Sequence, residues 1–229
     1  MILASRKRQR GGRRSSNRTK YAVIALLAVI LVVFSSWYVF VYSQQGKPPA
    51  SGSGIIYATL STSQGSIEVE LYNNSAPKTV TNFVHLAQSG FYNSLVWHRI
   101  VSGFVIQTGD PNTLNGGGDP STWGQGSSTQ KVPLEVNDTS LHNNAGYLSM
   151  ARGNDPNSGS SQFFINLTNN PSLDGRYTVF GKVIKGLDVA LAIGNLPVNP
   201  QCQPSGGLQC QPTNTNQAML ISVTISKTP

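Results

Sequence analysis

The stretch WHRIVSGFVIQTGD, residues 97–110, constrains the fold more than any other part of the chain. It is typical of two short strands joined by a turn at Ser102–Gly103, and alternate residues of a strand share one face. Arg99 and Gln107 then stand among tryptophan, isoleucine, phenylalanine and valine. Polar groups in apolar surroundings need partners. Arg99 is therefore either paired within the protein or directed at a ligand.

Two later stretches complete a pattern with this one. Residues 145–167 read AGYLSMARGNDPNSGSSQFFINL, and residues 173–183 read LDGRYTVFGKV. The motifs WHRI-x-x-GF-x-x-Q-x-GD, LSMA, GSSQFFI and LDG-x-x-x-VFG follow one another in an order and spacing that resemble the cyclophilin family of peptidyl-prolyl isomerases. The resemblance spans roughly Tyr57 to the C-terminus, and four motifs in order are far more specific than one.

This resemblance implies a mainly β fold, a closed eight-stranded antiparallel barrel capped by two helices. It implies that Arg99 donates to the prolyl amide nitrogen and that Gln107 orients Arg99. The glycine-rich loop 111–130 would form a wall of the substrate groove. The remaining substrate-binding residues that the resemblance implies are Phe104, Val105, Ala151, Arg152, Gln162, Phe164, Leu173 and Tyr177.

The sequence departs from the family pattern at four positions. Val105 stands where a pocket methionine is common, and Arg152 where the groove carries asparagine. Ser172 replaces a tryptophan and Tyr177 a histidine of many eukaryotic members, and a tyrosine there is similar to bacterial cyclophilins. These changes leave open a second reading, a non-catalytic module or membrane-tethered chaperone that holds proline-containing segments without accelerating exchange.

The residue inventory argues against several other chemistries. His85, His98 and His142 form no HExxH or H-x-E pattern, so no metal site is expected. The chain contains no G-x-S-x-G elbow, Walker motif or dinucleotide fingerprint. The resemblance implies no cofactor, because prolyl isomerisation makes no bond and releases no proton.

The positive charge is concentrated in one short segment. Lys and Arg number 17 against 9 Asp and Glu, a net charge of +8, and eight of the cations precede Tyr21 without any acid among them. The rest of the chain carries nine charges of each sign. A basic tail of this kind does not indicate a nucleic-acid-binding face, so no nucleic-acid partner is expected.

The segment after this tail predicts a membrane anchor. Residues 21–42 carry no charge and as a helix would be about 33 Å long at ~1.5 Å per residue, enough to span a hydrocarbon core. We expect a basic cytoplasmic tail at 1–20, a transmembrane helix at 21–42, a flexible linker at 43–54 and a cyclophilin-like domain at 55–229. The alternative is a cleaved signal peptide, whose apolar region is normally shorter and followed by small residues.

The flanking cations place the N-terminus in the cytoplasm. A cell-membrane protein with a single pass and an extracytoplasmic catalytic domain follows, acting on proline-containing polypeptides that fold outside the membrane. The catalytic domain is expected to be monomeric.

Periodicity predicts the elements of the domain. Alternation predicts a hairpin turning at Gln64–Gly65. A helix is expected to begin at Ser75, which would cap it, and to end at Gly90, with a core-facing stripe of Val80, Phe83, Val84 and Ala87. Strands are expected at 56–60, 66–72, 132–136, 146–150, 162–167, 177–183 and 218–226, and a second helix at 186–193.

The only cysteines are Cys202 and Cys210. Two cysteines without nearby histidines do not complete a tetrahedral zinc site. In an extracytoplasmic loop this C-x7-C spacing favours a local disulfide, and two reduced thiols are the alternative. The loop has no counterpart in the family pattern.

Overall fold

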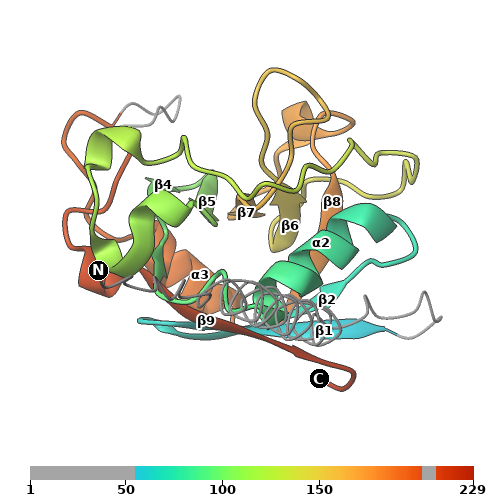
Figure 1. Ribbon diagram of the computed structural model, residues 1–229, viewed down its shortest axis with the longest axis horizontal. Coiled ribbons are helices and arrows are strands. Elements are labelled where there is room, and N and C mark those ends of the chain that lie inside the picture. Colours follow the sequence, from blue (N-terminus) through green and yellow to red (C-terminus); the bar gives the residue numbers. More distant parts are fainter. Residues whose placement is uncertain (1–54, 203–209) are drawn as a thin grey trace, which may run out of the picture. The chain divides into compact units, whose positions relative to one another are not determined.

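One antiparallel sheet organises the part of the chain that the structure, a computed structural model, describes, residues 55–202 and 210–229 (Figure 1). The segments predicted as tail, transmembrane helix and linker lie outside these residues. Within the described ranges, no helix combines the length and apolar character needed to cross a bilayer.

The sheet has nine strands in the order β3-β9-β1-β2-β8-β6-β7-β5-β4. Every pairing is antiparallel. In Figure 1 the long strands β1 and β9 lie at one edge of the view, and the loops lie beyond the short strands β4–β7. The strands are β1 (Ile56–Thr62), β2 (Gly65–Leu71), β3 (Leu95–Val96), β4 (Arg99–Val101), β5 (Val105–Thr108), β6 (Tyr147–Met150), β7 (Phe163–Asn166), β8 (Val179–Lys185) and β9 (Met219–Ser226).

The predicted amino-terminal hairpin is confirmed. β1 pairs with β2 from Ile56 opposite Leu71 to Thr62 opposite Gly65. On β2 the apolar residues Ile67, Val69 and Leu71 are buried, as the alternating pattern indicates.

The prediction of a closed eight-stranded barrel was wrong in its strand count and closure. The run from Leu95 to Val101 is interrupted at Trp97–His98, so β3 pairs with β9 whereas β4 pairs with β5. β3 and β4 are the two ends of the strand order. Because only two residues separate them, these ends lie within about 11 Å at this point. The sheet is therefore curled, and the chain itself joins its two edges.

Helix α2 (Pro77–Gln88) packs its apolar stripe into the curled sheet. Val80, Phe83, Val84 and Ala87 are all buried, as predicted. The Phe83 ring centroid lies 5.2–5.4 Å from those of three aromatic residues, Tyr92, Phe163 and Phe180. His85 faces solvent. The helix is thus a core element, which fixes β7 and β8 from inside.

The cap of α2 differs from the prediction. Ser75 does not cap the helix; its hydroxyl donates to Asp138 Oδ2 at 2.7 Å. The Glu135 carboxylate accepts instead from the backbone N–H groups of Lys78 (3.1 Å) and Thr79 (2.8 Å). A distant acidic side chain therefore satisfies the first-turn donors and complements the helix dipole.

The segment that supplies Glu135 is not the strand predicted at 132–136. Val132 makes a single bridge to Gly159, and the residues after it are irregular. Their backbone N–H groups donate to side chains and not to a neighbouring strand: Leu134 N–H donates to Asn157 Oδ1 and Glu135 N–H to Thr178 Oγ1. The second helix, α3 (Leu187–Gly194), agrees with the prediction to within one residue.

Asp110 organises the long polar loop that follows β5. Its carboxylate, fully buried, accepts hydrogen bonds from the backbone N–H groups of Asn112, Gly124 and Gly126. The loop contains two short 3-10 helices, η1 (Pro111–Gly116) and η2 (Pro120–Thr122). Trp123 is buried beneath it. A buried carboxylate with three donors holds this loop in one place.

The cysteines belong to two segments, 198–202 and 210–212, that pair with each other next to β4. Cys202 and Cys210 are joined by a disulfide, with their Cα atoms 4.4 Å apart. Val198 bridges to Pro212, and Ile100 N–H donates to the Cys210 carbonyl at 2.8 Å. The strand that carries Arg99 is therefore attached to this stapled segment.

Candidate active site

A pocket of about 350 Å³ opens between β4, β5, β7 and the loop that precedes β8. Nine of the ten site residues predicted from sequence line it, and Gly124 completes the lining. The tenth, Gln162, lines an adjoining pocket. Residues far apart in sequence thus converge on one cleft, and their roles in substrate binding stay predictions. The predicted residues that line the first pocket are Arg99, Phe104, Val105, Gln107, Ala151, Arg152, Phe164, Leu173 and Tyr177.

The apolar wall comes from two neighbouring strands and a 3-10 turn. Val105 on β5 and Phe164 on β7 are buried, while Phe104 and Leu173 are half-buried. Phe164 meets the Tyr177 ring edge-to-face, with centroids 5.5 Å apart. This wall suits a compact apolar group such as a proline ring.

Arg99 stands at the edge of this apolar wall. It lies directly opposite Gln107 in the β4–β5 ladder, and the Gly103 turn, with φ +68°, joins the two strands. Its Cζ is 5.8 Å from the Phe104 ring centroid. Burial lowers the pKa of the guanidinium, and the nearby Tyr177 partly offsets this. Arginine remains protonated at neutral pH, so a fixed positive donor faces the pocket.

Gln107 and Gln162 tie the pocket to the long loop. Gln107 Nε2 donates to Gln162 Oε1 at 2.8 Å. Gln162 Nε2 donates in turn to the carbonyls of Gly124 (3.1 Å) and Gly126 (2.6 Å). The amide chain therefore runs from the strand beside Arg99 to the loop wall.

Arg152 caps the opposite rim. Its guanidinium lies over the Tyr177 ring, 5.0 Å from the centroid. It also donates to the carbonyls of Arg176 and Gly153, each at 2.8 Å. Ala151 N–H donates to the Gln162 carbonyl, which holds this rim to the end of β7. Ser172 is exposed outside the pocket.

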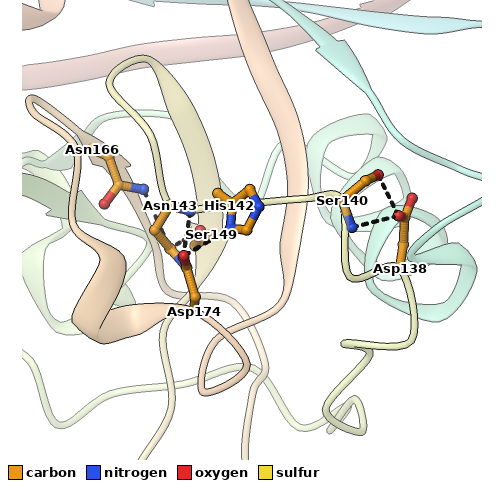
Figure 2. A network of polar contacts seen from close by, with 7 residues as sticks. All are labelled: Asp138, Ser140, His142, Asn143, Ser149, Asn166 and Asp174. Carbon is orange, nitrogen blue, oxygen red and sulfur yellow. Dashed lines mark hydrogen bonds and ion pairs between the residues drawn. The ribbon is translucent and has the colours of Figure 1, made fainter.

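A polar network, exposed at His142 and buried at Asn143, Ser149 and Asn166, links the turn after Leu173 to β6 and β7 (Figure 2). Asp174 accepts from the backbone N–H of Asn143 (2.7 Å) and from His142 Nδ1 (2.8 Å). Burial alone would raise the pKa of the Asp174 carboxyl, but the hydrogen bonds from Asn143 and His142 bring it below its usual value. These bonds fix the turn that follows Leu173.

The same network reaches the other side of the wall. Asn143 Oδ1 accepts from Ser149 Oγ at 2.8 Å and from Asn166 Nδ2 at 3.4 Å. Asn170 Nδ2 then donates to Asn166 Oδ1 and to the Phe104 carbonyl. Both Leu173 and Phe104 are therefore positioned by one set of side-chain amides.

His98 lies beneath the site and is not placed for proton transfer with a substrate. Its side chain is almost fully buried. Burial lowers its pKa to about 4, against the opposing influence of Asp110, so the imidazole is neutral at pH 7. Within residues 55–202 and 210–229, no three His, Cys, Asp or Glu side chains come together as a metal site would require.

Two positions of the site, Gly124 and Asp110, are not predicted from the sequence. From the sequence, Gly124 belongs only to a predicted loop wall and Asp110 only to the end of a motif. The signal for Asp110 was present, since a carboxylate directly after a strand and before Pro111 can accept from the N–H groups of the next turn. Nothing local indicates that Gly124 returns to the pocket.

The family of the chain is shown by comparison with known proteins. The sequence profile of the family described as "Cyclophilin type peptidyl-prolyl cis-trans isomerase/CLD" matches residues 57–214. The chain belongs to this family and is an isomerase of peptidyl-prolyl bonds.

Curated relatives give the same assignment. The chain is similar to "Peptidyl-prolyl cis-trans isomerase-like 1" of Aspergillus niger, with 45% identity over 148 residues, 65% of this chain and 87% of the relative. It is also similar to "Peptidyl-prolyl cis-trans isomerase ppi1" of Schizosaccharomyces pombe, with 43% identity over 145 residues, 63% of this chain and 89% of the relative. Both relatives are fungal and lend no support to the bacterial-like character predicted from Tyr177.

Solved structures agree on the fold. A cyclophilin type isomerase of Cryptosporidium parvum, crystallised in the presence of the dipeptide Ala-Pro, superposes with a TM-score of 0.63 at 28% identity, covering 74% of this chain and 98% of that chain. The cyclophilin AquaCyp293 of Hirschia baltica has a TM-score of 0.56 at 23% identity, covering 73% of each chain. The latter likeness concerns the fold alone.

Proposed function

We propose that the pocket holds the proline of an X-Pro segment and that Arg99 accelerates rotation by donating to the prolyl nitrogen. The barrier to rotation is roughly 18–20 kcal/mol and arises from the partial double bond of the amide. Rotation ends the resonance and leaves the lone pair on nitrogen. A guanidinium placed there stabilises the twisted amide more than either planar form.

The observation that carries this proposal is the position of Arg99 at the edge of an apolar pocket. Phe104, Val105, Phe164 and Leu173 supply the contact surface for the ring. Gln107, directly across the ladder from Arg99, belongs to the amide chain that holds the loop wall. This favours a positioning role for Gln107 through the wall as well as toward Arg99.

We further propose that the domain acts at a membrane surface, outside the cytoplasm. The support comes from the sequence: an uncharged segment at 21–42 follows eight cations. Fractionation of the native host, followed by protease protection of intact cells or spheroplasts, tests this. The domain should sediment with membranes and be cleaved from outside; a soluble, protected domain would contradict the proposal.

Exchange spectroscopy by NMR on a short X-Pro peptide tests the activity. The full-length protein should accelerate cis-trans exchange well beyond the uncatalysed scale of tens to hundreds of seconds, and Arg99→Ala should largely abolish the acceleration. Peptide signals that shift without faster exchange would instead favour a module that only holds proline segments. Val105, in place of the common methionine, is the residue that gives this second outcome some weight.

A further inference from the structure

A second pocket of about 300 Å³ adjoins the proline pocket, and we name it the flank pocket. The two pockets share Gln107, Gly124, Ala151 and Arg152. A peptide that places its proline in the first pocket therefore extends a neighbouring residue into the second. The other residues of the flank pocket are Gln125, Gly126, Ser127, Lys131, Gly153, Ser158, Ser160 and Gln162.

The charged residues that line the flank pocket are all basic. Lys131 and Arg152 both line it, and none of its lining residues is acidic. Three nearby carboxylates lie outside its lining. Asp110 is buried behind the loop and accepts from backbone N–H groups. Glu135, four residues from Lys131, accepts from backbone N–H groups at the start of α2, and Asp155 accepts from Asn157 N–H within its own turn. Lys131 and Arg152 are therefore the charged side chains that a peptide bound in this pocket meets.

Both cations have defined positions. Arg152 is held over Tyr177 and by the carbonyls of Arg176 and Gly153. Lys131 Nζ donates to Ser127 Oγ at 2.9 Å. Arg152 is already ordered, so pairing with an anion costs less side-chain entropy than it would for a free arginine. Arginine at this position is also a departure of this chain from the asparagine of the family pattern.

We propose that this isomerase prefers X-Pro segments with an aspartate or glutamate two or three residues from the proline, on the side that enters the flank pocket. The inference rests on the proposed function, because it takes the first pocket to be the proline site. The distance follows from the roughly 3.3–3.6 Å that each residue spans in an extended chain. Partly exposed charge pairs of this kind give a preference of about 1.4- to fivefold.

The test uses the full-length protein and peptides that differ at one position. Glutamate, glutamine or lysine is placed two or three residues before or after the proline, and kcat/KM for exchange is measured for each. One position should favour glutamate over glutamine by about 1.4- to fivefold and disfavour lysine. The preference should shrink as the salt concentration rises from roughly 0.05 to 0.5 M, because exposed charges are screened.

Lys131→Glu is the informative variant, and Lys227→Glu is its matched control. Both change the net charge equally, but Lys227 follows β9 and lines neither pocket. Lys131→Glu should reverse the ratio of glutamate to lysine peptides, whereas Lys227→Glu should leave it unchanged. The ratio of kcat/KM for the glutamate and lysine peptides is taken within each protein, so a loss of activity common to both peptides does not change it.

Two results would overturn the inference: equal rates for glutamate and glutamine peptides at every position, or the same ratios in both lysine variants. If the protein accelerates cis-trans exchange in no peptide, the proposed activity is wrong. The peptide dissociation constants, measured from NMR shifts, then test the preference for acidic peptides by themselves. Glutamate peptides that bind no tighter than glutamine peptides would contradict it there as well.

Discussion

The side-chain amide of Gln107 donates a 2.8 Å hydrogen bond to that of Gln162. Gln162 Nε2 donates in turn to the carbonyls of Gly124 and Gly126. A strand residue opposite Arg99 is thereby coupled to a loop that a buried Asp110 holds from its other side. The pocket owes its shape to this polar chain as much as to its apolar wall.

Gln162→Leu should therefore loosen the loop wall. It leaves the Gln107 amide and two carbonyls without their partner, which costs about 1–3 kcal/mol where such groups stay buried. We expect lower stability in urea and about a tenfold loss of kcat/KM. Gln88→Leu, at the exposed end of α2, is the control and should change neither. Wild-type activity in Gln162→Leu would show that the hydrogen bonds of Gln162 are not needed for catalysis.

Glu135 should be the cap on which α2 depends. Glu135→Ala is expected to lower the free energy of unfolding by about 1–2 kcal/mol, since two backbone donors lose their acceptor. Glu68→Ala removes a carboxylate whose ion pair with Lys185 is exposed and should cost under about 1 kcal/mol. Urea denaturation compares the two. Equal losses would mean that the cap contributes nothing specific.

Local patterns predicted the hairpin β1–β2, the buried stripe of α2 and the position of α3, because each depends on periodicity within one segment. The polar residues Arg99 and Gln107 also indicated the pocket. Burying a polar side chain among apolar neighbours costs free energy unless it has a partner or a ligand. The structure places both on its rim.

The features that sequence reasoning missed depend on distant partners. Glu135 lies 56 residues from Thr79, and no local rule pairs them, so Ser75 was predicted as the cap. The break at Trp97–His98 arises because β3 and β4 pair with different strands. The run at 132–136 reads as a strand from its composition, but Asn157 and Thr178 take its backbone donors.

His98 should make the fold sensitive to acid. Its pKa is lowered to about 4 by burial, from 6.5. Between pH 4 and pH 6.5 the imidazole is therefore protonated in the unfolded chain and neutral in the folded chain. Stability should therefore fall as the pH drops from about 6.5 toward 4, by on the order of 3 kcal/mol from this group. His98→Gln should lack this component in urea titrations at pH 7 and pH 4.5. An identical pH dependence in both proteins would contradict the assignment.

The disulfide should stabilise the segment beside β4. Replacing both Cys202 and Cys210 with serine is expected to lower the free energy of unfolding by roughly 2–3 kcal/mol, from the loop-closure entropy of a short loop. Wild type treated with a reductant should fall to the stability of the double variant, while the variant itself should not respond. A wild type indifferent to reductant would show that the bond adds no stability.

We expect Arg99 to act on the twisted amide and not on substrate binding. The most direct measurement compares exchange rates and peptide dissociation constants by NMR for wild type, Arg99→Lys and Arg99→Ala. Arg99→Ala should lose about 10²–10³ in exchange rate while the dissociation constant changes by less than about threefold. Arg99→Lys should recover little, because lysine lacks the planar donor. Weaker binding with an unchanged rate in the bound state would contradict the account.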